Sequence, residues 1–267
     1  MTEQTTNTGT FIWNELATRD FAAAKTFYTQ LFGWGCEVSP LPGEMPGDYA
    51  LFKLGDVDIG GAYGMAGEMF EGVPPHWAAY VAVDDVDATL AKASASGGTP
   101  TWPAMDIPSI GRMGGFMDPT GAAIAVFKMG EKEERPDLGA ALGGFCWNEL
   151  VTNDIAAAAA FYSEVFGWVA NHKGDDSSMP YTEWMVGDKS VGGMLQIDPN
   201  WGPIPPHWAV YVSVEDCDAT VAKALGLGAE IKAPGMDIPD VGRFACLADP
   251  TGGVFSVITL TAKHFEQ

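Results

Sequence analysis

The chain is short of basic residues and of long apolar segments. Its 267 residues include 14 Lys and Arg against 35 Asp and Glu, which gives a formal net charge of −21. Without any Lys/Arg-rich run, neither a nucleic-acid backbone nor an anionic membrane surface is the expected partner. No apolar run approaches the roughly 20 residues of a membrane span, and the polar start, MTEQTTNTGT, lacks the apolar core of a signal peptide.

Cysteine is also scarce, and the four cysteines are scattered along the sequence. The four cysteines, Cys36, Cys146, Cys217 and Cys246, form no CxxC motif, and four scattered thiols in a chain of this length do not make a disulfide framework. These absences favour a cytoplasmic protein whose partner is a small molecule. Nothing in the sequence selects between a monomer and a homodimer.

What is present is a duplication. FIWNELATRDFAAAKTFYTQLFGW, from Phe11 to Trp34, returns as FCWNELVTNDIAAAAAFYSEVFGW, from Phe145 to Trp168, with 15 of 24 positions identical. PPHWAAYVAVDDVDATLAKA and MDIPSIGRMGGFMDPTG likewise return as PPHWAVYVSVEDCDATVAKA and MDIPDVGRFACLADPTG. Each copy spans about 130 residues, which suits a small domain and not a solenoid repeat.

The repeat predicts two tandem domains, over residues 9–130 and 145–262, joined by a linker at 131–144. The linker region combines charges, a proline and glycines, which are typical of a boundary. The length of the chain agrees with two domains.

Each half divides again into two strand-helix-strands modules. Asp20 can cap a helix in which Phe21, Ala24, Tyr28 and Leu31 follow at 3-4-3 spacing, and Gly33 can end that helix. A second helix follows Asp85 or Asp87 and stops at a pair of glycines, and YALFKLGDVDIGGAYGM reads as a hairpin around Gly55. The fold class is therefore α+β, with four modules whose helices lie outside mostly antiparallel sheets.

These segments resemble a known family. ATRDFAAAKTFYTQLFGW, YVAVDDVDATLAKASASGG and DPTGAAIAVF are similar to the motifs of the vicinal oxygen chelate superfamily, which includes glyoxalase I, the bleomycin-resistance proteins and the extradiol dioxygenases. The resemblance covers nearly the whole chain, once per half, and the tandem form is similar to two-domain actinobacterial glyoxalase-like proteins. It implies βαβββ modules, paired so that each pair forms a U-shaped sheet around a cavity.

The resemblance also locates the metal ligands of the metal-dependent members. The three main ligand positions are counted from the aspartates that begin the helices and from the DPTG motifs. In the two halves these positions hold Trp13 and Trp147, Ala78 and Ala209, and Ala125 and Ser256. The region of the fourth ligand offers only Gln196 as a weak candidate. Divalent ions need converging imidazole, thiolate or carboxylate donors, so we expect no metal and no cofactor, and metal-dependent chemistry is disfavoured.

Strand alternation predicts what lines each cavity instead. The residues expected on the inward faces are Trp13, Glu15, His76 and Tyr80 in the first half and Trp147, Glu149, His207 and Tyr211 in the second. Aromatic walls with a few polar groups are typical of a small-molecule pocket, and we assign the two Trp and two Tyr to ligand binding.

Glu15 and Glu149 are the candidate general bases, because a carboxylate desolvated beside Trp would have a raised pKa. The alternatives are a carboxylate exposed in an open cavity or one paired with an arginine. Arg112 and Arg243 are candidate partners and ligand-binding residues, unless they only join a loop to a strand. His76 and His207 are candidate acid/base partners, or else surface or hydrogen-bonded residues.

Three functions follow from these residues and the resemblance. The first is a glyoxalase/bleomycin-resistance-like protein that binds a small, partly aromatic or carbonyl-containing molecule in a cavity without metal. The second is a glyoxalase-like lyase or isomerase that acts on a small carbonyl compound with Glu15 and Glu149 as bases. The third is a hydroxylase or tailoring enzyme of secondary metabolism. We favour binding over catalysis.

Overall fold

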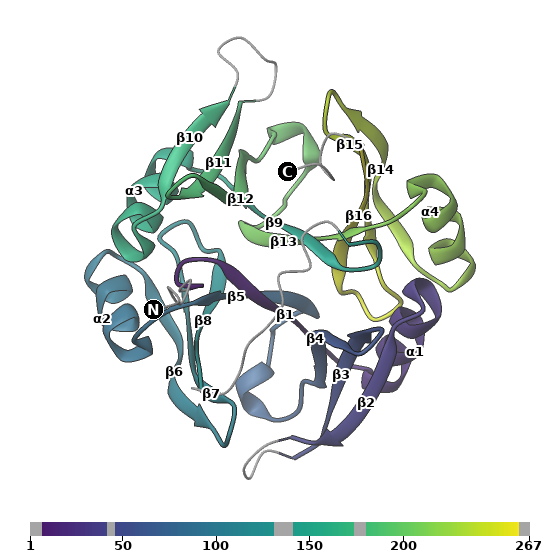
Figure 1. Cartoon of the computed structure of the whole chain (residues 1–267), viewed down its shortest axis with the longest axis horizontal. Helices are drawn as coiled ribbons and strands as arrows, with labels where there is room; N and C mark the ends of the chain where they lie inside the picture. The colour runs from purple at the N-terminus through teal and green to yellow at the C-terminus, as the bar shows by residue number, and fades with distance from the viewer. Residues whose placement is uncertain (1–6, 42–45, 131–140, 174–179, 262–267) are drawn as a thin grey trace, which may run out of the picture. The chain divides into compact units, whose positions relative to one another are not determined.

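The computed structural model describes residues 7–41, 46–130, 141–173 and 180–261, and within them it contains the four expected modules (Figure 1). Modules 1 and 2 comprise β1 (Phe11–Thr18), α1 (Phe21–Phe32), β2 (Gly35–Pro40), β3 (Asp48–Leu54), β4 (Val57–Gly64), η1 (Glu68–Phe70), β5 (His76–Ala82), α2 (Val86–Ala95), β6 (Thr99–Ile107), β7 (Gly111–Met117) and β8 (Ala123–Met129). Modules 3 and 4 comprise β9 (Phe145–Thr152), α3 (Ile155–Phe166), β10 (Val169–Lys173), β11 (Tyr181–Val186), β12 (Lys189–Gln196), η2 (Pro199–Trp201), β13 (His207–Ser213), α4 (Cys217–Gly226), β14 (Glu230–Ile238), β15 (Gly242–Ala248) and β16 (Val254–Leu260).

Aspartate caps begin all four of these helices. The side chain of Asp20 accepts a hydrogen bond from the backbone N–H of Ala23 at 3.0 Å, and Asp85, not Asp87, does the same for Ala88 at 2.9 Å. Asp154 and Asp216 repeat the arrangement in the second half. Gly33 ends α1 in the left-handed conformation, with φ 71°, which glycine adopts without steric cost. The caps predicted from the sequence are therefore confirmed.

The strands form two eight-stranded sheets, ordered β2-β3-β4-β1-β5-β8-β7-β6 and β10-β11-β12-β9-β13-β16-β15-β14. The hairpin strands pair antiparallel, whereas β1 pairs with β4, and β5 with β8, in parallel. Each parallel pair spans a helix, as a strand-crossover-strand connection requires. Mixed sheets with few helices confirm the α+β class.

The compact units of the structure do not coincide with the halves of the sequence. Unit 1 consists of Met1–Trp13, Ala79–Glu134 and Asn148–Trp208, and unit 2 of Asn14–Ala78, Arg135–Trp147 and Ala209–Gln267. Unit 1 thus contains most of modules 2 and 3, and unit 2 most of modules 1 and 4. The predicted domain boundaries describe the repeat and stay a prediction. Part of the predicted linker, residues 131–140, lies outside the described residues.

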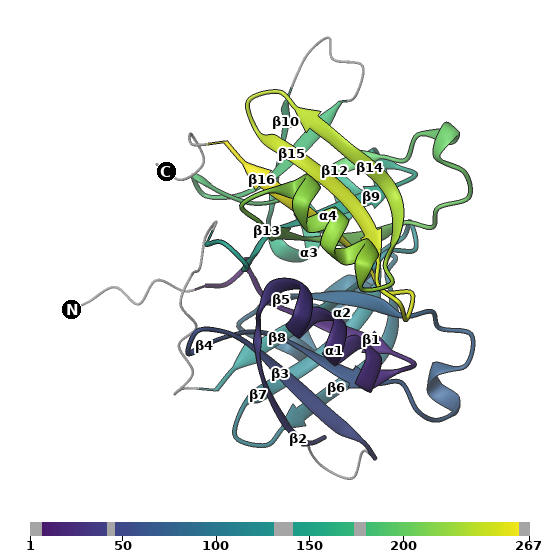
Figure 2. The same cartoon turned by 90° about the vertical axis from the view of Figure 1, so that its right-hand side faces the viewer.

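In unit 2, α1 and α4 lie side by side (Figures 1 and 2). The apolar core beneath them takes its side chains from both modules, since Tyr28 and Phe52 of module 1 and Leu247 and Phe255 of module 4 belong to one buried cluster. Unit 1 repeats this plan with α2 and α3, where Phe116 packs against Phe161 with ring centroids 5.7 Å apart.

A buried hydrogen-bonded clasp joins the two modules of each unit. In unit 2 the Tyr28 hydroxyl donates to Asp249 at 2.8 Å and accepts from the Trp77 indole N–H at 2.9 Å. In unit 1 Tyr162 donates to Asp118 at 3.0 Å and accepts from Trp208 at 2.8 Å. Burial, reinforced by the aspartate charge, raises the pKa of both tyrosines, so the phenols stay protonated as donors.

The first residue of each repeat lies in a core and not on a ligand-facing surface. Alternation along β1 places Phe11 on the same face as Trp13 and Glu15, but Phe11 packs against Trp168 and Trp208 with centroids 5.6 and 5.1 Å apart. Gly192 makes room for this ring, because a Cβ there would lie 3.0 Å from it. Phe145 packs in the same way beside Gly60 in unit 2.

None of the helices in the described ranges is long and apolar enough to cross a membrane. The four α-helices have 12 residues or fewer, about half of what a bilayer requires.

Candidate ligand-binding faces

Each module has a sheet face that its helix does not cover, which we call the helix-free face. In module 1 the helix side is defined by Ala50, Phe52 and Ala62, which are fully buried in the unit 2 core. Residues that alternate with these in the strands point to the other side. Directly paired residues of neighbouring strands share a face, so Glu15, Gly61 and Leu51 form one row across β1, β4 and β3.

Around Glu15 the helix-free face of module 1 is aromatic. Tyr49 and Tyr63 are paired across β3 and β4, and the ring of Tyr49 lies over Gly61, where a Cβ would be 2.9 Å from its Cε1 atom. The glycine therefore lets the Tyr49 hydroxyl approach the strand position opposite Glu15. Glu15 and Tyr63 are diagonal neighbours across β1 and β4, and burial, and secondly the Glu15 charge, raise the pKa of Tyr63.

A short segment supplies a third ring to this group. Phe70, in η1, lies 6.0 Å from Tyr63 between ring centroids. The segment is held by Arg19, whose Nη2 donates to the backbone oxygens of Phe70 at 2.6 Å and Val73 at 2.9 Å. Glu15, Tyr49, Tyr63 and Phe70 are named the module 1 cluster. It combines one carboxylate with three aromatic rings, all within unit 2.

The equivalent face of module 3, in unit 1, has a different character. Glu149 is only 6% exposed and pairs with Gly193, whose other neighbour is Glu183 on β11. Glu183 forms an ion pair with Lys173 at 3.1 Å. Leu195 stands where module 1 has Tyr63. Glu15 is thus half-buried among phenols in unit 2. Glu149 is buried in unit 1, in the same row as the acidic residue Glu183.

The two candidate histidines have matching local structure. Nδ1 of His76 lies 2.9 Å from the Pro74 carbonyl oxygen, and Nδ1 of His207 lies 2.9 Å from that of Pro205. A carbonyl can only accept, so Nδ1 of each ring carries a proton, and Nε2 is an acceptor whenever the ring is neutral. Burial lowers the pKa of His207, which favours that neutral form. An acid/base role for both histidines stays a prediction.

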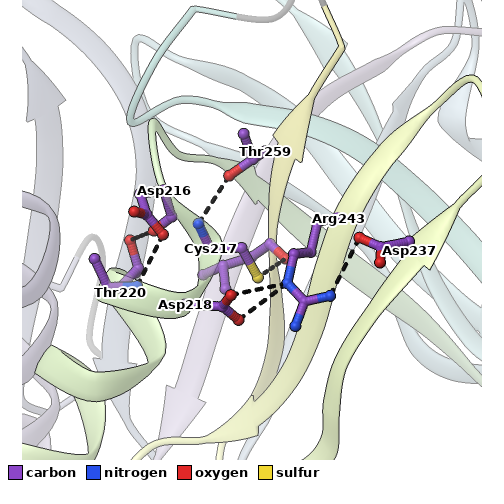
Figure 3. Close-up of polar contacts among 9 residues, drawn as sticks. Asp216, Cys217, Asp218, Thr220, Asp237, Arg243 and Thr259 are labelled. Carbon is purple, nitrogen blue, oxygen red and sulfur yellow. Dashed lines mark hydrogen bonds and ion pairs between the residues drawn. The ribbon is translucent and has the colours of Figure 1, made fainter.

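The two candidate arginines bind aspartates on the helix side of their sheets. Arg112 contacts Asp87 of α2 and Asp106 of β6, both at 2.8 Å. Arg243 contacts Asp218 of α4 at 3.0 Å and Asp237 of β14 at 3.1 Å (Figure 3). These contacts join a helix to a hairpin. Each guanidinium is about one-third exposed, so its stabilising contribution is modest, and a role in ligand binding stays a prediction.

The remaining predicted site residues divide between the units. Tyr80 and Tyr211 are buried, at 4% and 7% exposure, while Trp13 and Trp147 are half-buried. In the first half, Trp13, Tyr80 and Arg112 belong to unit 1, and Glu15 and His76 to unit 2. In the second half, Glu149 and His207 belong to unit 1, and Trp147, Tyr211 and Arg243 to unit 2. A shared cavity for either set stays a prediction.

The residues at the inherited metal positions do not fit a divalent ion. Indole and methyl groups offer no ligand atoms, and the hydroxyl of Ser256 is a single weak donor. In residues 7–41, 46–130, 141–173 and 180–261, no three His, Cys, Asp or Glu side chains gather where they could hold an ion. A catalytic metal ion is therefore not expected at these positions.

Two grooves lie beside the helices and contain none of the predicted site residues. One, of about 250 Å³, runs along α2 and the end of α3 in unit 1. The other, of about 460 Å³, lies between α1 and Pro250 in unit 2. Both are open to solvent and lined mostly by small side chains.

Sequence analysis missed Tyr49, Tyr63 and Phe70. Their pairing with Glu15 depends on the register of β3 and β4, which alternation within a single strand cannot reveal. The signal that could have found them is GGAYGM: two glycines and an aromatic residue in one strand indicate close approach of a bulky neighbour.

The fold agrees with the family comparisons. Residues 10–126 match the model of the Glyoxalase/Bleomycin resistance protein/Dioxygenase superfamily, and residues 146–258 match that of the Glyoxalase-like domain. Two relatives match over nearly the whole chain, so the chain belongs to this superfamily as a tandem two-domain member.

The first relative is the "Putative glyoxylase CFP32" of Mycobacterium tuberculosis, which is 41% identical over 254 residues, or 94% of each chain. The second is the anthracycline biosynthesis protein DnrV of Streptomyces peucetius, which is 36% identical over 93% of this chain and 92% of its own length.

Solved structures confirm the fold at low identity. The Mn(II)-bound glyoxalase from Novosphingobium aromaticivorans aligns with a TM-score of 0.60 and 19% identity, over 94% of this chain and 82% of its own. The 2,3-dioxygenase LapB from Pseudomonas sp. KL28 aligns with a TM-score of 0.63 and 15% identity, over 94% and 93%.

Proposed function

We propose that this chain binds a small, partly aromatic or carbonyl-containing molecule on its helix-free faces, without a metal ion. The observation that carries the proposal is the module 1 cluster. Three rings around one carboxylate provide flat apolar surface together with a hydrogen-bond acceptor, a combination typical of pockets for small molecules. The relative named for anthracycline biosynthesis supports a fused aromatic ligand that bears carbonyl and hydroxyl groups.

The test uses alizarin, a dihydroxyanthraquinone, as the probe. Titration of the full chain should show saturable binding by calorimetry and by tryptophan fluorescence. Phe70→Ala should weaken the binding about tenfold, because it removes one aromatic wall of the module 1 cluster. Met69→Ala is the matched control, since this neighbouring side chain is 70% exposed and its removal should leave the affinity unchanged. Equal affinities of the two variants would contradict the placement of the site.

A second candidate function is a lyase or isomerase reaction on a small carbonyl compound. The burial of Glu149 favours it, because a desolvated carboxylate suits proton abstraction next to a carbonyl, and the name of the mycobacterial relative points the same way. With the hemithioacetal of methylglyoxal and glutathione as substrate, Glu149→Gln and Glu15→Gln should each lower turnover about 100-fold or more. Glu183→Gln is the control on the same face. If the wild-type chain shows no turnover, the catalytic proposal is overturned and only the binding proposal remains.

A further inference from the structure

The segment between β4 and β5 of module 1 lies at the surface of unit 2. Residues 67–72, which we call the η1 segment, contain the short helix η1, and none of the helix residues is buried. Met69 is 70% exposed, and the N–H of Phe70 donates within the segment, to the Gly67 carbonyl oxygen at 3.3 Å. A segment with few buried apolar contacts has low local stability, so its opening would leave the core of unit 2 intact.

A glycine in the left-handed region stands at each end of the η1 segment. Gly67 has φ 90° and Gly72 has φ 75°, a conformation that glycine adopts without steric cost. The space around the Cβ position of both glycines is open. Rotation of the backbone at these two residues therefore meets little resistance, which is what the hinges of a moving loop require.

Arg19 fastens the η1 segment to the start of module 1. Its Nη2 atom donates to the carbonyl oxygens of Phe70 at 2.6 Å and of Val73 at 2.9 Å. Arg19 stands between β1 and Asp20, the cap of α1, so its backbone is part of a rigid frame. Charge-assisted bonds of this kind are stronger than bonds between neutral groups. They hold the ring of Phe70 against Tyr63, at the edge of the module 1 cluster.

The second half replaces each part of this arrangement. Counted back from the PPHW motifs, the two glycines correspond to Asp198 and Pro203. Counted along the first repeat, Arg19 corresponds to Asn153. The Asp198 carboxylate accepts from the backbone and side-chain nitrogens of Asn200, at 2.8 and 2.7 Å. The segment in unit 1 is thus fixed by its own residues, whereas the η1 segment is fixed by an arginine from outside it.

We propose that the η1 segment is a flap that opens on Gly67 and Gly72, and that Arg19 is the latch that keeps it closed over the edge of the module 1 cluster. The inference rests on the proposed function, because the flap governs how a ligand enters and leaves that site. Opening breaks both Arg19 bonds and withdraws the Phe70 ring, since the ring and one accepting carbonyl belong to the same residue. Arg19 is therefore a positioning residue that sets the rates of binding and release.

The latch predicts a kinetic signature that a merely structural arginine would not give. A ligand enters and leaves while the flap is open, so its association and dissociation rate constants both follow the open fraction. Arg19→Gln should raise both rate constants about tenfold, an effect limited by the exposure of Arg19. Because the latch weakens equally in the free and the bound protein, the dissociation constant should stay the same. Phe70→Ala, which removes the wall itself, should instead raise the dissociation constant.

Stopped-flow fluorescence of the full chain with alizarin measures both rate constants. Lys25→Gln is the matched control, since it also removes one positive charge from module 1, and Lys25 lies over the Phe21 ring, with Nζ 5.9 Å from the centroid. Its rate constants should equal those of the wild-type chain. Unchanged rate constants in Arg19→Gln, or a higher dissociation constant with an unchanged association rate constant, would overturn the latch and leave the proposed function in place.

Amide hydrogen exchange of the free protein, followed by NMR, tests the latch without any ligand. The Val73 N–H donates to the Phe70 carbonyl oxygen across the Gly72 hinge, at 3.1 Å, and should exchange about tenfold faster in Arg19→Gln. Amides of β1 and β4 should keep their wild-type rates, which establishes that the variant is folded. An unchanged Val73 rate would overturn the latch. If the wild-type chain does not bind alizarin, the proposed function falls, and the exchange rates still decide whether Arg19 holds the flap.

Discussion

Residues 1–134, expressed without the second half, should not fold to a stable monomer. Each compact unit takes its core from one module of each half. In the isolated half, Tyr28 would lack Asp249, and Phe27 would lack Phe255, whose ring centroid lies 5.9 Å away. Half of each apolar core would be exposed to water, which removes the main driving force for folding. Size-exclusion chromatography with light scattering and near-ultraviolet circular dichroism check this expectation.

The matched experiment supplies the missing half in trans. Co-expression of residues 1–134 with residues 135–267 should restore a one-to-one complex with the near-ultraviolet spectrum of the intact chain. A first half that folds alone should do so only by self-association, because module 2 of a second copy can stand in for module 4. A monomeric first half with native-like tertiary signals would show that the sequence repeat, and not the compact unit, is the folding unit.

Asp249→Ala is expected to lower the free energy of unfolding by about 3–5 kcal/mol. Asp249 is only 3% exposed. It accepts from the Thr251 backbone N–H and hydroxyl, both at 2.7 Å, from the Gly253 N–H at 3.1 Å and from Tyr28 at 2.8 Å. Alanine would leave these buried donors unsatisfied, which costs more than the loss of an exposed ion pair. Urea denaturation followed by far-ultraviolet circular dichroism measures the change.

Two further substitutions serve as controls. Asp118→Ala in unit 1 should have a similar effect, because Asp118 accepts from Thr120, Gly121, Ala122 and Tyr162 in the same way. Asp237→Ala removes a carboxylate that is 78% exposed and paired with Arg243, and should cost less than about 1 kcal/mol. Equal losses for Asp237 and Asp249 would contradict a structural role for the buried clasp.

The two halves preserve their architecture more closely than their candidate binding faces. The caps and clasps recur with nearly equal distances in both copies. The helix-free faces differ, with Tyr63 against Leu195 and Trp102 against Ala233. A fold can be duplicated and kept while its faces diverge, because the packing residues and the ligand-facing residues alternate along the same strands. Any binding experiment should therefore treat the halves as separate sites.

The sequence by itself determined the modules. Helix caps, glycine stops and strand alternation are local, so Asp20, Gly33 and the hairpin around Gly55 could be read without the fold. The family resemblance followed from the same motifs, and the unsuitability of Trp13 and Ala125 as metal ligands required only their chemical identity. The apolar face of β5 was also readable, because burial on one face imposes a period of two, but that Trp77 packs in the core of unit 2 and Val81 in that of unit 1 was not.

Only the tertiary structure decided which modules form a common core and which side chains meet on each face. The clasp between Tyr28 and Asp249 joins residues 221 positions apart, and no local pattern encodes such a distance. The module 1 cluster and the packing of Trp102 against Gly115 depend on strand register, since a shift by one residue would turn every side chain to the other face. Register is set by long-range packing, and for this reason the composition of the candidate site became visible only in the folded chain.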